Sequence, residues 1–293
     1  MKSIWINKGY IAQIASAATG GIYALLGFIG TFVSLDEILP FDMAIWLKVM
    51  ISVLVLLTIW GCCFCGVAYY MVRKKYFQIF SANNGHALYV QYGDLFDEKE
   101  VKNPSERRNI VVPVNCCFDT RVDNHIISEK TVHGKVLKHL YESGRYTEES
   151  LTKLIEKSLE NVEYKHLSEQ EKPEGNRNRY PIGTVIDLPE SENKHYFLWA
   201  LSTFDSDLKA HTSMQEYVLA VQKLIEACNT ESEGFPVVLP LVGTGLSRTK
   251  KNQRDILQYL INEFRLNQSE INCDIHIVVR ENVKNEIAIM NIH

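Results

Sequence analysis

Charged residues are missing from two long stretches of this 293-residue chain. No Asp, Glu, Lys or Arg occurs from Gly9 to Leu35 or from Val49 to Val72. As α-helices rising about 1.5 Å per residue, both stretches exceed the roughly 30 Å hydrocarbon core of a bilayer. The first also continues too far beyond its "ASA" triplet for a cleaved signal peptide. The absence of charge therefore predicts a membrane hairpin over residues 1–75, with spans at about 9–35 and 49–72.

The chain also lacks the pattern of a disulfide scaffold or a metal site. Three of its seven cysteines, Cys62, Cys63 and Cys65, lie inside the second uncharged stretch. This "CCFC" cluster has no His or acidic neighbour and lacks the spacing of a zinc knuckle. We therefore expect free thiols, no metal and no cofactor.

Basic residues flank the two spans mainly on one side; Lys48, just inside the second hydrophobic stretch, can snorkel towards the loop-side interface. The connecting loop has no base and carries Asp36, Glu37 and Asp42, whereas the outer flanks carry Lys2, Lys8, Arg73, Lys74 and Lys75. An excess of Lys and Arg marks the cytoplasmic side of a membrane protein. Both termini and the whole C-terminal part are therefore expected in the cytoplasm.

Small residues form a stripe along the first span. Ser16, Gly20 and Ala24 recur every four positions, with Ala17 and Gly21 beside them. Such a stripe lets helices approach closely. Either the two helices of one hairpin pack through it, or several hairpins assemble through it.

Beyond a short linker at residues 76–86, strands alternate with helices to the end of the chain. The expected strands are "ALYVQYGD", "NIVVPVN", "GTVIDL", "HYFLWALS", "FPVVLPLV", "CDIHIVVR" and a final edge strand "EIAIMNI". The expected helices are "TVHGKVLKHLYES", "TEESLTKLIEKSLENV", "TSMQEYVLAVQKLIEAC" and "NQRDILQYLINEF". Thr131 and Thr147 are expected to cap the first two helices. The segment "SEQEKPEGNRNR" is expected to be a solvated loop. This alternation predicts an α/β class domain over residues 87–293, a three-layer α/β/α sandwich with a mixed sheet.

Two loops have the composition of an anion site. The first, "GTGLSR", follows an apolar strand and supplies Gly243, Thr244, Gly245, Leu246, Ser247 and Arg248. Glycines let backbone amides approach an oxyanion beyond the carboxyl end of a strand. A dinucleotide fingerprint or a Walker A loop would need Gly at position 248, where Arg248 stands. The loop is therefore a diphosphate site of another kind, or a tight turn.

The second loop, the helix-opening loop, leads into the first turn of a predicted helix and contains Ser128, Thr131, His133 and Gly134. Unpaired amides and the helix dipole favour an anion there. His133 is a general base, a ligand contact or only a neighbour of the helix cap. Asp94, at the end of the first strand, is a turn residue or an acceptor for the amine of a base.

Four segments of the chain resemble, in order, the four ligand-contacting segments of macro domains, which bind ADP-ribose. They are "YGDLFD", "VVPVNCCFD", the helix-opening loop and "VVLPLVGTGLSR". The resemblance implies that Asp94 holds the adenine amine beside the Leu95 amide, and that Asn115 matches the first Asn of the family's "NAAN" motif. It implies a ligand-contacting set completed by Asp119, Ser128, Thr131, His133, Gly134 and residues 243–248.

The chain departs from the macro-domain pattern at two points. Phe118 stands in place of the second Asn of "NAAN", and "DNHIISEKTVHG" replaces a "GGGVA" type loop. Both departures favour binding without turnover, so the chain is not expected to be an enzyme. The alternatives are a membrane-anchored ADP-ribosyl hydrolase using Asn115, Asp119 or His133 for proton transfer, a plain ADP-ribose reader, or a structural anchor.

Two spans ahead of such a domain resemble the effectors of type II Thoeris anti-phage defence systems. The resemblance implies a bacterial inner-membrane protein acting in abortive infection, with a TIR-domain partner that converts NAD into histidine-ADP-ribose. It implies that this ADP-ribose derivative triggers oligomerisation and membrane disruption, and that no nucleic acid is bound. A histidine-bearing ligand would need acidic or aromatic neighbours, for which Asp119, Asp123, Phe204 and Asp205 are candidates.

Overall fold

The computed structural model describes residues 2–32, 44–74, 76–96, 107–242, 252–284 and 286–289. The chain divides into two compact units. One consists of residues 1–77 with 283–293, and the other of residues 78–282. The first unit holds the two apolar helices and the second holds the α/β domain.

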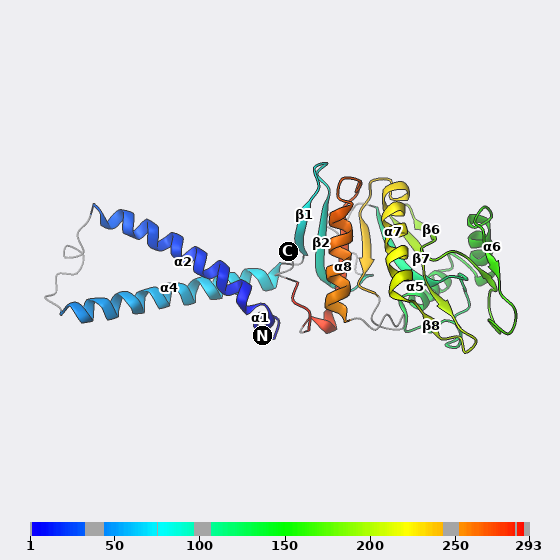
Figure 1. Cartoon of the computed structure of the whole chain (residues 1–293), viewed down its shortest axis with the longest axis horizontal. Helices are drawn as coiled ribbons and strands as arrows, with labels where there is room; N and C mark the ends of the chain where they lie inside the picture. Colours follow the sequence, from blue (N-terminus) through cyan, green and yellow to red (C-terminus); the bar gives the residue numbers. More distant parts are fainter. Residues whose placement is uncertain are drawn as a thin grey trace. The chain divides into compact units, whose positions relative to one another are not determined.

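Two long helices make up most of the first unit (Figure 1). After the short α1 (Lys2–Ile6), α2 runs over Lys8–Gly30 and α4 over Ile45–Arg73. Both are long and apolar enough to cross a membrane. Helix α2 ends at Gly30, earlier than the predicted end at Leu35, and residues 33–35 lie outside the described ranges.

The two helices contact each other as an antiparallel pair. Trp60 Nε1 donates to Ser16 Oγ at 3.0 Å, and the Tyr23 hydroxyl donates to the Ser52 carbonyl at 3.3 Å. Helix α2 also buries Ala15 in this pair. These contacts give the hairpin a defined register.

Two glycines of the small-residue stripe take no part in packing within the hairpin. A Cβ at Gly20 or Gly21 would meet nothing within 4 Å. The residues that α2 buries are Ile11, Ala15 and Thr19. The close approach that these glycines allow is therefore not used between α2 and α4.

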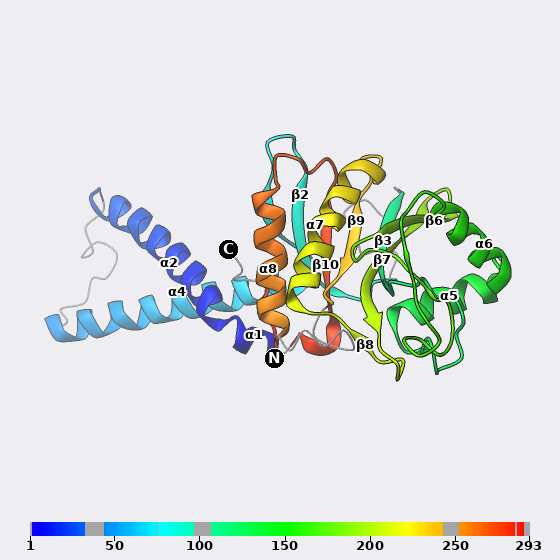
Figure 2. The same cartoon turned by 45° about the vertical axis from the view of Figure 1, so that its right-hand side comes forward.

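A mixed eight-stranded sheet is the centre of the second unit. Its strands are β1 (Tyr76–Ser81), β2 (Ala87–Gly93), β3 (Arg108–Asn115), β6 (Val185–Ser191), β7 (Lys194–Phe204), β8 (Ala210–His211), β9 (Val237–Pro240) and β10 (Ile275–Arg280). The order is β1-β2-β10-β9-β3-β7-β6, and β8 pairs with β7 (Figure 2). Strands β2, β10, β9, β3 and β7 are parallel, whereas β6 and β8 are antiparallel to β7. The predicted mixed α/β sheet is confirmed.

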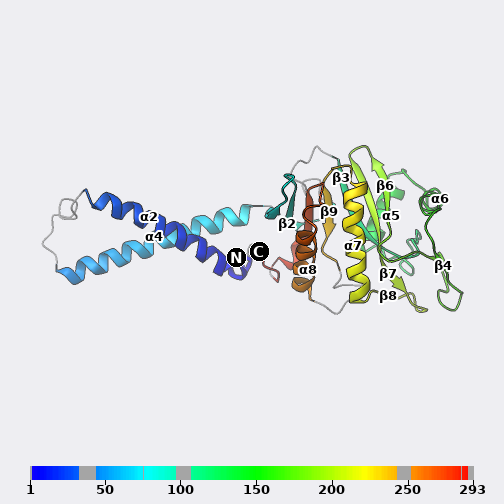
Figure 3. The same ribbon diagram turned by 45° about the horizontal axis from the view of Figure 1, so that its top comes forward.

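Helices cover both faces of this sheet. They are α5 (Val132–Glu142), α6 (Glu148–Ser158), α7 (Met214–Glu231) and α8 (Gln253–Leu266), with α7 and α8 side by side (Figure 3). Leu198 of β7 shares an apolar cluster with Leu137 of α5, whereas the next residue, Trp199, donates to the Ala220 carbonyl of α7. Because successive strand residues point to opposite faces, α5 and α7 lie on opposite sides.

The predicted helix caps are confirmed. Thr131 Oγ1 accepts from the Gly134 amide at the start of α5, at 2.9 Å. Thr147 forms a capping box with Ser150 at the start of α6. Each cap satisfies amides that have no partner inside the helix.

Two segments differ from the expectation. Residues Tyr76–Ser81, expected within a linker, form β1, and only Phe77 is buried there, which explains the weak sequence signal of this strand. The expected final edge strand is absent from residues 286–289, which follow the 3₁₀-helix η1 (Glu281–Val283), and residues 290–293 lie outside the described part.

The expected solvated loop between α6 and β6 is anchored to the domain. It follows β4 (Lys165–His166) and ends in β5 (Asn178–Arg179), and these two strands pair with each other. Between these strands, the fully buried Lys172 places its Nζ 2.9 Å from Asp119 Oδ2. A paired lysine can be buried where an isolated one would be too costly, so composition alone misplaced this segment.

Candidate functional site

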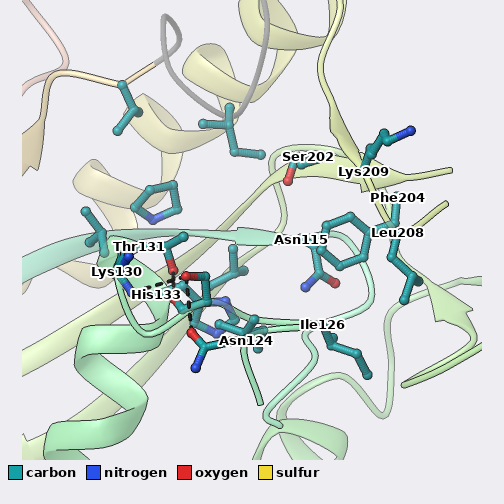
Figure 4. A pocket seen from close by; sticks show the side chains of 18 of the residues that line it. Asn115, Asn124, Ile126, Lys130, Thr131, His133, Ser202, Phe204, Leu208 and Lys209 are labelled. Atoms are coloured by element: carbon teal, nitrogen blue, oxygen red, sulfur yellow. Dashed lines mark hydrogen bonds between the residues drawn. The ribbon is translucent and has the colours of Figure 1, made fainter. Parts of the chain in front are cut away.

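A pocket of about 500 Å³ lies at the carboxyl ends of the parallel strands. Its lining includes Asn115 at the end of β3, and Ser202 and Phe204 at the end of β7 (Figure 4). Val242, shortly after β9, and Arg280, the last residue of β10, also line it. Ligands of α/β sheets bind at this edge. The topology therefore brings together side chains that are far apart in the sequence.

The helix-opening loop forms one wall of the pocket. Ser128, Thr131 and His133 line it, as does Asn124. Thr131 Oγ1 donates to the Ser128 carbonyl at 2.7 Å, and Asn124 Oδ1 accepts from the Glu129 amide at 3.1 Å. These local bonds fix the loop at the first turn of α5.

Gly134 shapes this wall without lining the pocket. A Cβ at Gly134 would lie 2.2 Å from the Ser128 carbonyl oxygen and 2.9 Å from the Glu129 Cα. Only glycine therefore lets the backbone of the loop pack so closely on α5.

The His133 side chain is uncharged at neutral pH. It is 7% exposed, and burial lowers the pKa of its imidazole to about 3. A base with so low a pKa accepts a proton poorly. The ring can still donate or accept one hydrogen bond inside the pocket, depending on its tautomer.

Asn115 is held by a bond to its own turn. Its Oδ1 accepts from the Cys117 amide at 2.9 Å, and the side chain is buried in the pocket lining. Its Nδ2 donates to none of the other residues that the structure describes. This amide is therefore available as a donor to a ligand.

Phe118 lies in the core and does not line the pocket. It has a positive φ of 49° and packs edge-on against Tyr180, with ring centroids 5.8 Å apart. Asn adopts this left-handed backbone more readily than Phe does. The position that resembles the second Asn of "NAAN" thus contributes an apolar contact.

Asp119 is occupied within the protein. Its Oδ1 accepts from the Asn176 amide at 2.6 Å and from Lys172 Nζ at 3.1 Å. Gly175, at φ +77°, passes so close that a Cβ there would lie 2.2 Å from Asp119 Oδ1. Asp119 is absent from the pocket lining, so this placement gives no support to a ligand contact.

Asp94 and Leu95 stand at the same sheet edge as the pocket. Asp94 follows Gly93, which pairs with the pocket residue Arg280. Asp94 Oδ1 accepts from the Phe96 amide at 3.0 Å, and Leu95 is buried in an apolar cluster. Neither lines the pocket, and their adenine contact stays a prediction.

The six residues of the glycine-rich loop, Gly243, Thr244, Gly245, Leu246, Ser247 and Arg248, lie outside the described residues. Val242, directly before this segment, and Gln253, the first residue of α8, both line the pocket. A diphosphate contact by the loop stays a prediction.

The described part of the pocket lining carries positive formal charge and no carboxylate. The cations are Lys130, Lys209 and Arg280. Lys209 also pairs with Asp207, at 2.8 Å. This lining suits an anionic ligand.

Of the candidate neighbours for a histidine-bearing ligand, only Phe204 lines the pocket. Asp123 pairs with Arg121 at 2.7 Å, and Asp205 with His211 at 2.6 Å. The three lining cations Lys130, Lys209 and Arg280 were not among the residues predicted from the sequence. Arg280 could have been found from its place at the end of a buried strand, whereas Lys209 depends on the β7–β8 hairpin.

Comparisons with known proteins identify the domain. The family described as "Thoeris protein ThsA, Macro domain" matches residues 88–280. The Thoeris protein ThsA of Bacillus amyloliquefaciens (strain Y2) is 29% identical over 167 residues, which cover 56% of this chain and 51% of that protein. The match thus spans about half the length of this relative.

Two solved structures are similar at low identity. A protein from Bacteroides thetaiotaomicron is 13% identical with a TM-score of 0.37, covering 64% of this chain and 97% of its own. A mutant of an Oceanobacillus iheyensis macrodomain is 12% identical with a TM-score of 0.39, covering 75% and 94%. Since the family match extends over most of the chain, the protein belongs to the ThsA macro-domain family of Thoeris anti-phage defence.

Proposed function

We propose that this chain is a membrane effector whose macro domain receives an ADP-ribose-derived signal. The observation that carries the proposal is the pocket at the carboxyl sheet edge, whose described charges, Lys130, Lys209 and Arg280, are all positive. A diphosphate needs cations and amide donors of this kind. The ligand that we expect is histidine-ADP-ribose, made by a TIR-domain partner.

The pocket favours binding over catalysis. His133 was the candidate general base in the helix-opening loop. Burial lowers the pKa of its imidazole to about 3 and keeps the ring neutral. Phe118 packs in the core, and Asp119 is paired with Lys172. Two of the three residues named for proton transfer, His133 and Asp119, are therefore poorly suited to it, and Phe118 offers no polar group to a ligand.

The hairpin is the part of the chain that acts on the membrane. Its two helices are long and apolar enough to cross a membrane. The basic flanks favour a cytoplasmic location for both termini and the macro domain, and we expect the protein in the bacterial inner membrane. Signal binding then favours an oligomer that disrupts the membrane, provided that the ligand binds the assembled state more tightly than the resting state.

Calorimetric titration of the full chain in detergent tests the pocket. The ligands are ADP-ribose, NAD, cyclic ADP-ribose and histidine-ADP-ribose, with chromatography of each mixture for products. We expect tight binding of the conjugate and no turnover. Indifference to all four ligands would refute the receptor, and steady conversion of histidine-ADP-ribose into ADP-ribose would favour the hydrolase.

A matched pair of variants assigns the binding to this pocket. Lys209→Gln removes a lining cation that pairs with Asp207, and Lys223→Gln removes one that pairs with Glu226 on α7, away from the lining. Lys209→Gln should weaken binding about tenfold, the effect of one charge-assisted hydrogen bond. Lys223→Gln should leave the affinity unchanged, and equal losses in both variants would place the ligand elsewhere.

A further inference from the structure

The open end of the hairpin, where α2 begins and α4 finishes, collects basic and aromatic side chains. The bonds from Trp60 to Ser16 and from Tyr23 to Ser52 set the antiparallel register. Residues before Ser16 therefore lie level with residues after Trp60. Helix α1 contacts α4 in the same unit, so Trp5 and Lys8 lie at the same end as Tyr69 and Arg73.

The cations at this end lie over aromatic rings. Lys8 Nζ is 4.0 Å from the centroid of the Trp5 ring, and Arg73 Cζ is 4.3 Å from that of Tyr69. Trp5 is 70% exposed and Tyr69 60% exposed. Such pairs leave the outer side of each cation open to an anion while the ring shields its inner side.

No carboxylate in the described ranges forms an ion pair with Lys8, Arg73 or Lys74. Elsewhere in the chain, cations such as Lys153 and Lys223 pair with acids of their own helix. The positive charge at the open end of the hairpin is therefore not neutralised by these residues.

The length of α4 places this end at the level of lipid headgroups. The helix has 29 residues, so it extends over roughly 43 Å, against a hydrocarbon core of about 30 Å. Its last turns, with Tyr69 and Arg73, consequently reach the interface when the apolar centre spans the core. Trp and Tyr prefer this interface.

We propose that Trp5, Lys8, Tyr69, Arg73 and Lys74, the basic collar, bind the headgroups of anionic phospholipids. The rings sit at the interface and the cations contact the phosphodiester. Clustered basic residues next to a span attract anionic lipid in this way. The inference rests on membrane insertion of the hairpin, which is part of the proposed function, and goes beyond it by naming the lipid class.

Electron spin resonance of the full chain in phosphatidylcholine vesicles tests the collar. The probes are spin-labelled phosphatidylglycerol and spin-labelled phosphatidylcholine, and the motionally restricted fraction of each gives their relative association constant. We expect a preference of about threefold to tenfold for phosphatidylglycerol, falling as salt is raised. Lys8→Gln, Arg73→Gln and Lys74→Gln together should remove it.

A charge-conserving variant is the control. Lys8→Arg, Arg73→Lys and Lys74→Arg together keep every positive charge and should keep most of the preference. An inserted wild-type chain without preference for phosphatidylglycerol overturns the inference, and so does a preference that survives the three Gln substitutions. Release of the chain from vesicles by alkaline carbonate would instead refute insertion, and with it the proposed membrane function.

Discussion

The hairpin exposes many of its apolar side chains, whereas the α/β domain buries most of its own. The domain fully buries large side chains such as Trp199, Tyr217 and Phe264. The hairpin exposes Phe28 by 67% and Leu54 by 66%. Burial from water drives the folding of the domain, whereas an exposed apolar helix is stable when lipid surrounds it.

The two regions also differ in the polar groups that they bury. The domain buries an ion pair, Asp119 with Lys172. The hairpin buries neutral groups instead, such as Thr19, whose hydroxyl donates to the Ala15 carbonyl at 2.7 Å. Changes at each kind of buried group should therefore affect one region and spare the other.

The largest expected effect is the loss of half of the buried ion pair. Lys172→Met leaves the Asp119 carboxylate buried beside Asn176 without its cation. We expect a loss of about 3–5 kcal/mol in the free energy of unfolding of the domain. Denaturant unfolding of the full chain in detergent, with the helicity of the hairpin followed separately, measures this loss.

A double variant separates charge from packing. Asp119→Asn with Lys172→Met removes both charges and keeps an oxygen acceptor for the Asn176 amide. We expect it to regain most of the stability, because a neutral buried pair leaves no isolated charge. A Lys172→Met domain as stable as the wild type would contradict the role of the pair.

A methyl group at Gly134 should also destabilise the domain. In Gly134→Ala, the new Cβ meets the Ser128 carbonyl oxygen at 2.2 Å, so the pocket wall must shift. We expect a destabilisation of about 1–3 kcal/mol, with weaker binding of histidine-ADP-ribose. Thermal unfolding and titration measure the two losses, and an unchanged affinity would show that this wall does not contact the ligand.

Acid should destabilise the domain through His133. Its pKa is about 3 when folded, against an ordinary value of 6.5. Below pH 6.5 the unfolded chain binds a proton that the folded domain does not, so stability falls as the pH falls towards 3. The expected slope is about 1.4 kcal/mol per pH unit. Denaturant unfolding between pH 7 and about 4 measures it, and His133→Asn should give a shallower slope.

Local patterns predicted those parts of the molecule that depend on neighbours in the sequence. Runs without charge predicted the two long apolar helices, and single hydroxyl residues predicted the caps Thr131 and Thr147. Asn115 was expected at the end of a buried strand and lies there in the pocket. Each of these features is fixed within a few residues.

Features that depend on distant contacts could not be predicted. Asp119 was expected to contact a ligand on the basis of the macro-domain resemblance. Its ion pair with Lys172 could not be predicted, because Lys172 lies in a segment whose composition is that of a solvated loop. Phe118 has a left-handed backbone with a φ of 49°, and its side chain lies in the core. A phenylalanine in the sequence does not indicate such a backbone. The lining role of Lys209 follows from pairing between β7 and β8.

The smallest expected effect is at Gly20, and it decides what the small-residue stripe does. A Cβ there meets nothing within 4 Å, in contrast to Gly134. Gly20→Ala should therefore leave the α2–α4 pair unchanged, as judged by helicity and by exchange of the α2 amides. If the stripe serves assembly between hairpins, the same variant should reduce the amount of cross-linked oligomers in vesicles. Two helices approach closely at Gly20 only when no side chain stands there. Oligomers that persist unchanged would place the assembly surface on another face.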